Sequence, residues 1–136
     1  MSYAAADAEI RNRLIAIWAG ATPIAWPNVS FEPPNPASPW IRFAVIDGDA
    51  RILELGANKI KTAHRMPGLI VIQLFDALQA GDGPIRTLAD TAAAIFRNWG
   101  GATVQCFAAT VKTIGDDGKG WYQVNVSIPF TRDELL

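Results

Sequence analysis

The run from Leu69 to Phe75 constrains the fold of this chain more than any other segment. It reads Leu-Ile-Val-Ile-Gln-Leu-Phe and is apolar at every position except Gln73. A strand with one wet face alternates apolar and polar residues, whereas a nearly continuous apolar run is typical of a strand covered on both faces. We therefore expect the segment 64–75 to hold a central strand, Leu69 to Phe75, with both faces covered.

Four further segments have the features of strands. Residues 40–47 place several apolar side chains on one face, and residues 51–55 follow after a short turn. Residues 103–112 and 121–130 flank a loop rich in glycine and aspartate, as the two strands of a hairpin do. Apolar and polar residues alternate along the last strand, so one of its faces should be buried and the other wet.

Two segments show the helical spacing of apolar residues. The first should begin near Ser2 and stop at Gly20. The second should run from Pro84 to Trp99, because proline suits the first turn of a helix and the following Gly100-Gly101 suits its end. The first stripe is Ile10, Leu14, Ile17 and Trp18, and the second is Ile85, Leu88, Ala92, Ile95, Phe96 and Trp99.

Residues 21–39 hold six of the nine prolines of the chain. Proline fixes φ and lacks a backbone N–H, so we expect an extended connector that is neither strand nor helix. Pro33, Pro36 and Pro39 also have the PxxP spacing that SH3-type domains bind. Such short matches are common by chance, and a stiff connector is the favoured interpretation.

The order of these elements is helix, three strands, helix, two strands. This order predicts an α+β fold in which a mostly antiparallel sheet of about five strands packs against two helices. A length of 136 residues suits one domain, which we place at residues 1–136.

The composition limits the classes of partner. The hydrophobic fraction is 50% and the charged fraction is 18%, compared with about 25% charged residues in an average soluble domain. A folded chain with little polar surface tends to self-associate. The alternative explanation of this composition is a monomer rich in alanine. A net charge of −1 gives no general attraction for nucleic acid. The chain shows no signal-peptide pattern and no apolar run of about 20 residues, so we expect no membrane contact.

The sequence offers little material for catalysis, cofactor binding or metal binding. Cys106 is the single cysteine and lies in an apolar run, which predicts a buried, inert thiol. His64 is the single histidine, and no serine or cysteine lies in a recognisable nucleophile motif that it could serve. We expect no catalytic site, no cofactor and no metal ion.

Two further patterns are better explained by local structure than by ligand binding. Asp47 with Asp49, and Asp116 with Asp117, stand beside glycines, as turn residues do, and neither pair matches a calcium-binding loop. The segment 81–83, Gly-Asp-Gly, lacks the lysine and hydroxyl residues of a phosphate-binding loop. We interpret it as the start of a helix.

Six residues are candidate protein contacts. Basic residues cluster around the hairpin between the second and third strands, where the alternative is a solvated loop. Two tryptophans near the proline-rich connector are candidates because aromatic residues often anchor interfaces, although core packing is the alternative for both. The candidates are Arg51, Lys59, Lys61, Arg65, Trp26 and Trp40.

Several segments, taken in order over nearly the whole chain, resemble one known family. They are residues 24–31 (Ile-Ala-Trp-Pro-Asn-Val-Ser-Phe), 39–43 (Pro-Trp-Ile-Arg-Phe), 68–75 (Gly-Leu-Ile-Val-Ile-Gln-Leu-Phe) and 81–83, with the helix that reaches Phe96. The chain is similar to the tail terminator, or tail completion, proteins of tailed bacteriophages and phage-derived particles.

The resemblance implies one sheet with helices and subunits that close into a six-membered ring on the end of the tail tube. The ring would stop polymerisation of the tube protein and offer a docking face to a head–tail connector or neck protein. DNA would only pass through it, and no catalysis is required. The protein would be assembled in the bacterial host cytoplasm and reside at the head-proximal end of the virion tail.

Two other functions remain as alternatives. A neck or head-completion protein shares the virion setting and differs in where it sits. A small-molecule-binding domain or enzyme, less favoured, would use a cleft between the second helix and the sheet.

Overall fold

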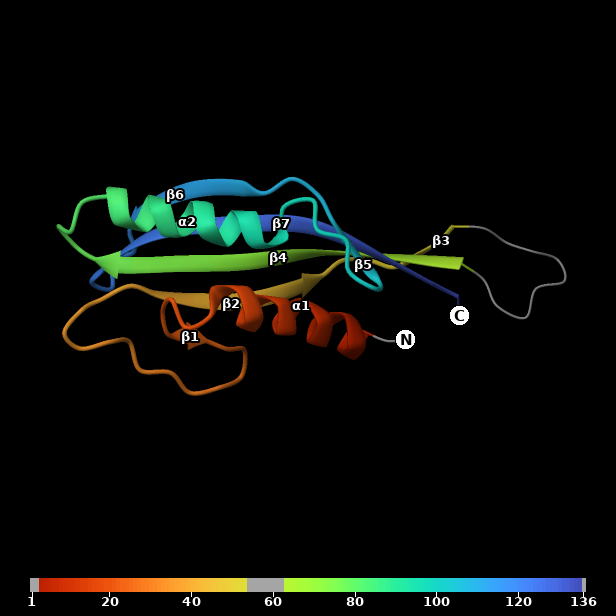
Figure 1. Cartoon of the computed structure of the whole chain (residues 1–136), viewed down its shortest axis with the longest axis horizontal. Helices are drawn as coiled ribbons and strands as arrows, with labels where there is room; N and C mark the ends of the chain where they lie inside the picture. The colour runs from red at the N-terminus through yellow and green to blue at the C-terminus, as the bar shows by residue number, and fades with distance from the viewer. Residues whose placement is uncertain (1–2, 54–62, 136) are drawn as a thin grey trace, which may run out of the picture.

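The computed structural model describes residues 3–53 and 63–135, which form two helices and a seven-stranded sheet (Figure 1). This arrangement confirms the α+β class and the mostly antiparallel sheet, with more strands than the expected five. The helices are α1 (Tyr3–Trp18) and α2 (Gly83–Phe96). The strands are β1 (Ile24–Ala25), β2 (Trp40–Asp47), β3 (Arg51–Ile52), β4 (Ala63–Ala77), β5 (Val104–Cys106), β6 (Thr110–Asp116) and β7 (Trp121–Leu135).

The sheet is organised around its two longest strands. Its order is β1-β2-β4-β7-β5, with β3 paired to β4 and β6 paired to β7. β4 and β7 are antiparallel and stay in register from Ala63 opposite Leu135 to Ala77 opposite Trp121. The apolar run of β4 therefore lies at the centre of the sheet, as its sequence predicts.

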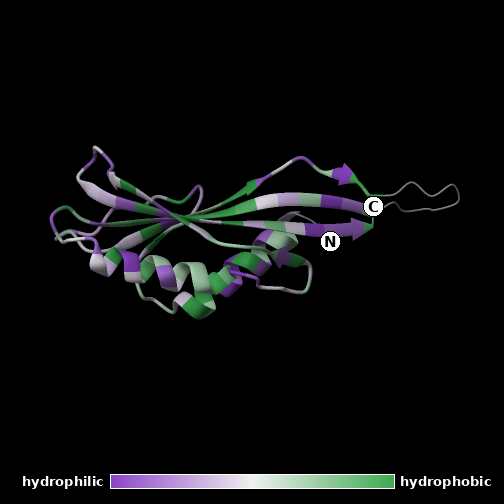
Figure 2. Cartoon of the chain, turned by 90° about the horizontal axis from the view of Figure 1, so that it is seen from above, coloured by the Kyte–Doolittle hydropathy of each residue, from purple (hydrophilic) through white to green (hydrophobic). Residues whose placement is uncertain are grey.

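Both helices lie on one side of the sheet (Figure 2). Ile70, Ile72 and Leu74 of β4 are buried in the core formed with the helices. The alternate residues Leu69 and Val71 are only half-buried, on the opposite side. We call this opposite side, where no helix of the described residues lies, the bare face. The prediction that both faces of the central strand are covered is therefore wrong for the single chain.

The buried line of α1 differs from the predicted stripe. Ile10 and Leu14 are buried as expected, and Ala6 extends their line, but Ile17 is 46% exposed. A step of four residues advances about 40° beyond a full helical turn. Because burial follows every fourth residue, the line has moved to Trp18 by the last turn and leaves Ile17 outside.

Two prolines interrupt the strands that neighbour β4 and β7. The carbonyl of Pro129 accepts a hydrogen bond from the Phe107 N–H, at 2.9 Å, in the gap between β5 and β6. The carbonyl of Pro67 accepts from the Gly48 N–H, also at 2.9 Å, in the gap between β2 and β3. A residue of an antiparallel ladder directs its N–H and C=O to the same neighbour, so each proline leaves a donor missing at the break. The strand predicted over 103–112 is therefore split in two.

The other differences are local. Ile24 and Ala25, inside the connector expected to contain no strand, pair in parallel with Ile41 and Arg42. Neither residue is a proline, so both keep the N–H that a ladder needs. The strand predicted over 51–55 is seen as β3, and its last two residues lie outside the described part.

The end of α2 comes earlier than predicted. The helix stops at Phe96, three residues before the expected Trp99. Arg97 has a ψ of 119°, which is not helical, and Asn98 follows with a φ of 55°, so the chain leaves the helix before the glycines are reached. Trp99 still packs edge-on against Phe96, with ring centroids 6.0 Å apart. Within 3–53 and 63–135, no helix has the length and apolarity to cross a membrane.

Ile10 and Ile17 lie two turns apart on α1 and differ in burial, which gives a matched stability test. Ile10→Ala empties a fully buried position and should lower the free energy of unfolding by about 2–5 kcal/mol. Ile17→Ala should change it by no more than about 0.5 kcal/mol, since that side chain is partly solvated. Urea unfolding followed by circular dichroism measures both, and equal losses would contradict the difference in burial between the two positions.

Candidate interaction surfaces

Two of the four predicted basic contacts meet at one end of the sheet. There β3 and the ends of β4 and β7 extend past the helices (Figure 1). Arg51 of β3 lies opposite Arg65 of β4. Arg65 donates from Nε to Asp133 Oδ1 and from Nη2 to Asp133 Oδ2, each at 2.8 Å. Lys59 and Lys61 lie outside the described residues.

The ion pair changes the charge that this end of the sheet presents. The hydrogen bond from Arg65 holds the pKa of the Asp133 carboxyl below its usual range, and the charge of Arg51 acts in the same direction. The same hydrogen bond raises the pKa of Arg65. Asp133 therefore offsets one of the two arginine charges, and the cluster is less basic than the sequence alone suggests.

Trp26 lies on the helix side of the sheet. Its ring meets Phe43 edge-on, with centroids 5.4 Å apart, and the Arg11 guanidinium lies 5.2 Å from its centroid. The side chain is half-buried against the main core. Its contacts within the chain are packing contacts, and contact with a partner stays a prediction.

Trp40 lies on the bare face, so the structure does not bring the two tryptophans together. Its ring stacks on Phe75 at 4.2 Å and meets Trp121 edge-on at 5.7 Å. Phe31 of the connector covers it, at 4.9 Å. Only 3% of Trp40 is exposed. Among the described residues, its buried indole Nε1 has no hydrogen-bond partner.

A groove of about 400 Å³ runs beside this aromatic cluster. Aromatic side chains line it, and Arg42 and Lys119 bring positive charge to it. The Asp117 carboxylate accepts hydrogen bonds from the N–H groups of Lys119 and Trp121 in the β6–β7 turn. The lining residues are Pro33, Trp40, Arg42, Gln73, Phe75, Asp117, Lys119, Trp121 and Gln123. Only Trp40 among them was a predicted contact, because the residues of β2, β4 and β7 become neighbours only through strand register.

The sequence did not predict the buried ion pair between Arg132 and Glu134. Arg132 is 2% exposed, and its Nη1 donates to Glu134 Oε2 at 2.6 Å while Nη2 contacts Met66 Sδ. Its guanidinium lies 4.9 Å from the centroid of the Tyr3 ring. Arg132 continues the inward alternation of β7 two residues beyond Phe130, where the predicted strand ended. Extending that alternation would have placed it inside.

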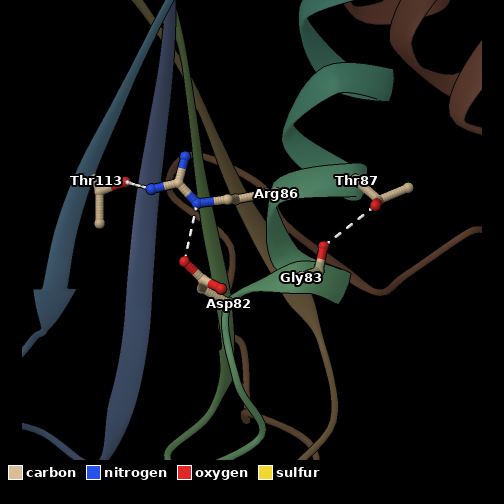
Figure 3. Close-up of polar contacts among 5 residues, drawn as sticks. All are labelled: Asp82, Gly83, Arg86, Thr87 and Thr113. Atoms are coloured by element: carbon tan, nitrogen blue, oxygen red, sulfur yellow. Dashed lines mark hydrogen bonds and ion pairs between the residues drawn. The ribbon is translucent and has the colours of Figure 1, made fainter.

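The segment before α2 is a helix start, as predicted. Asp82 stands at the N-cap, and its Oδ2 accepts from Arg86 Nε at 3.1 Å, while Thr87 Oγ1 donates to the Gly83 carbonyl (Figure 3). Arg86 Nη2 reaches Thr113 Oγ1 of β6 at 3.3 Å. The Asp82 carboxylate supplies the negative charge that a helix N-terminus favours.

The candidate nucleophile Cys106 and the aspartates Asp116 and Asp117 occupy structural positions. Cys106 is buried, and burial raises the pKa of its thiol to about 11. Asp116 and Asp117 accept hydrogen bonds from N–H groups within the β6–β7 turn. In the described ranges, no three histidine, cysteine, aspartate or glutamate side chains form a group that could hold a metal ion.

The phage tail terminator protein family matches residues 4–130, nearly the whole chain. The chain belongs to this family. Tail terminators are structural proteins of the phage tail and are not an enzyme family, so this chain has a structural role in a phage tail and is a component of the virion tail.

Solved structures agree on the fold of this tail terminator. Eight chains of solved structures are similar to it. One of them is 21% identical, with a TM-score of 0.70 over 97% of this chain and 96% of the other. At this identity the likeness establishes the fold alone. No curated protein matches the sequence.

The Arg65–Asp133 pair predicts a pH response at the exposed end of the sheet. Because the pKa of Asp133 is lowered in the fold, the stabilisation from this pair is present at neutral pH and is lost as pH falls through the lowered pKa. An NMR titration should give a low pKa for Asp133 that rises in Arg65→Gln and stays low in the control Arg97→Gln. A pKa that does not respond to Arg65→Gln would contradict the pairing.

Proposed function

We propose that this tail terminator caps the tail tube as a ring, ends polymerisation of the tube protein and forms the tail-side face of the head–tail junction. The observation that carries the proposal is the family match over residues 4–130. The ring would contain six copies, as the resemblance implies. Its partners would be the tube protein on one side and a connector or neck protein on the other, and DNA would pass through without being read.

The surface of the chain supports a role in assembly. The central strand places Leu69 and Val71 on the bare face, where they are only half-buried. Ile46, directly opposite Leu69, is also exposed. Apolar patches of this kind are typical of surfaces that another protein covers. A chain that polymerises only as far as one ring needs such surfaces and needs no catalytic site.

Removal of the gene tests the capping role. Without a cap, the tube protein should continue to polymerise, so electron microscopy should show abnormally long tails or tails without heads. Supplying the chain from a plasmid should restore the normal length and the junction. Normal tails joined to heads in the deletion strain would refute the capping role, and tails of normal length that lack heads would favour a neck protein.

We further propose that the basic residues of segment 51–65, namely Arg51, Lys59, Lys61 and Arg65, contact a partner subunit, and that Trp26 and Trp40 support neighbouring contacts. Arg51→Glu places a carboxylate opposite Arg65, so the fold should tolerate it. Combined with Lys59→Glu and Lys61→Glu, it should lower the yield of complete particles. The exposed Arg97→Glu is the control, and an unchanged yield in the triple variant would rule out this contact.

A further inference from the structure

The bare face carries an apolar band that crosses the sheet. Ile46 of β2 lies opposite Leu69 of β4, and Leu69 lies opposite Pro129 of β7. Phe107, hydrogen-bonded to Pro129, extends the row beyond β7. Ile46 is 54% exposed and Phe107 is 45% exposed. Four apolar residues from four neighbouring segments thus form one surface, which we call the apolar band.

The outward side of α1 is a second uncovered surface, which is uncharged and has Asn12 as its polar side chain. Ala8, Asn12, Ile15 and Ala16 lie opposite the buried line of the helix, and we call them the outer ridge. All four are exposed, Ile15 by 53%, and none is charged. A helix that faces water normally carries its charged residues on this side, whereas a helix that is apolar all round is normally buried.

The charged residues of α1 lie on its flanks and contact their own chain. Arg11 donates to Asp7 at 3.0 Å. Arg13 Nε donates to the Ile95 carbonyl at 2.7 Å, and Glu9 Oε2 accepts from Thr103 Oγ1 at 2.8 Å. These contacts leave the outer ridge without a charge of its own, so covering it costs little desolvation of charged groups.

The two surfaces complement each other in size and width. The band presents large side chains such as Ile46, Leu69 and Phe107, and the ridge presents mostly small ones, so facing layers can interdigitate. Three strand spacings of about 4.8 Å make the band about 14 Å wide, which accommodates one helix about 10 Å in diameter. A band facing another band, or a ridge facing another ridge, lacks this match.

We propose that the apolar band of one copy is covered by the outer ridge of α1 from the next copy. The helices lie on one side of the sheet and the bare face on the other, so the two surfaces of one chain point away from each other (Figure 2). Each copy then gives one surface and receives one, which is a heterologous contact, the kind that forms a ring when the rotation between successive copies closes. This inference rests on the proposed ring and assigns its subunit interface.

Cross-linking between copies tests the contact. The double variant Ile15→Cys with Ile46→Cys should form a ladder of covalent oligomers with a short bis-maleimide, both in purified particles and in the concentrated chain. Each single variant should form no ladder. Both positions are about half exposed, so cysteine should leave the unfolding temperature unchanged. The parent chain controls for Cys106, whose protonated, buried thiol should react slowly.

The pair Ile17→Cys with Ile46→Cys is the matched control, because Ile17 is exposed on the same helix but lies off the outer ridge. A ladder from this control equal to that of Ile15→Cys with Ile46→Cys would overturn the assignment. So would a dimer from Ile46→Cys alone, which indicates band-to-band contact, or a cross-link from Ile15→Cys to the tube protein. Absence of the ladder from complete particles would also overturn it.

The outcome is separable from the capping role. A ladder together with normal tails in the deletion strain would support the subunit interface and refute the capping function. Long tails in the deletion strain without a ladder would support the capping function and refute this subunit interface.

Discussion

The pairing of β4 with β7 is the interaction on which the rest of the structure depends. Both strands have 15 residues and stay in register over their whole length. Every other strand except β1 pairs directly with one of these two. Their inward residues supply the centre of the core on which both helices pack. The same register brings Arg65 to Asp133 at the exposed end and Phe75 close to Trp121 on the bare face.

The sequence predicted the features that depend on local patterns. The run around Ile70 and Ile72 predicted a central strand. The alternation of residues 121–130 predicted the first ten residues of β7, and Pro84 marked the start of α2. These signals arise within a single element. The overall α+β arrangement then followed from their order.

The features that the sequence did not predict depend on register and on partners. Arg65 and Asp133 are 68 positions apart, and only the pairing of two strands makes them neighbours. Trp26 and Trp40 lie on opposite sides of the sheet because of the path of the connector, which no periodicity describes. Leu69 and Val71 belong to a run that favours burial, but neither helix of residues 3–53 and 63–135 covers them.

Pro67 and Pro129 affect how the sheet can associate as well as how it folds. Unbroken neighbours of two 15-residue strands would present long edges of free backbone N–H and C=O groups, which are templates for adding strands without limit. Instead, the edge beside β7 is divided into a piece of three residues and a piece of seven. Short, interrupted edges direct association to the faces of the subunit, where side-chain shape can fix the number of copies and growth can end.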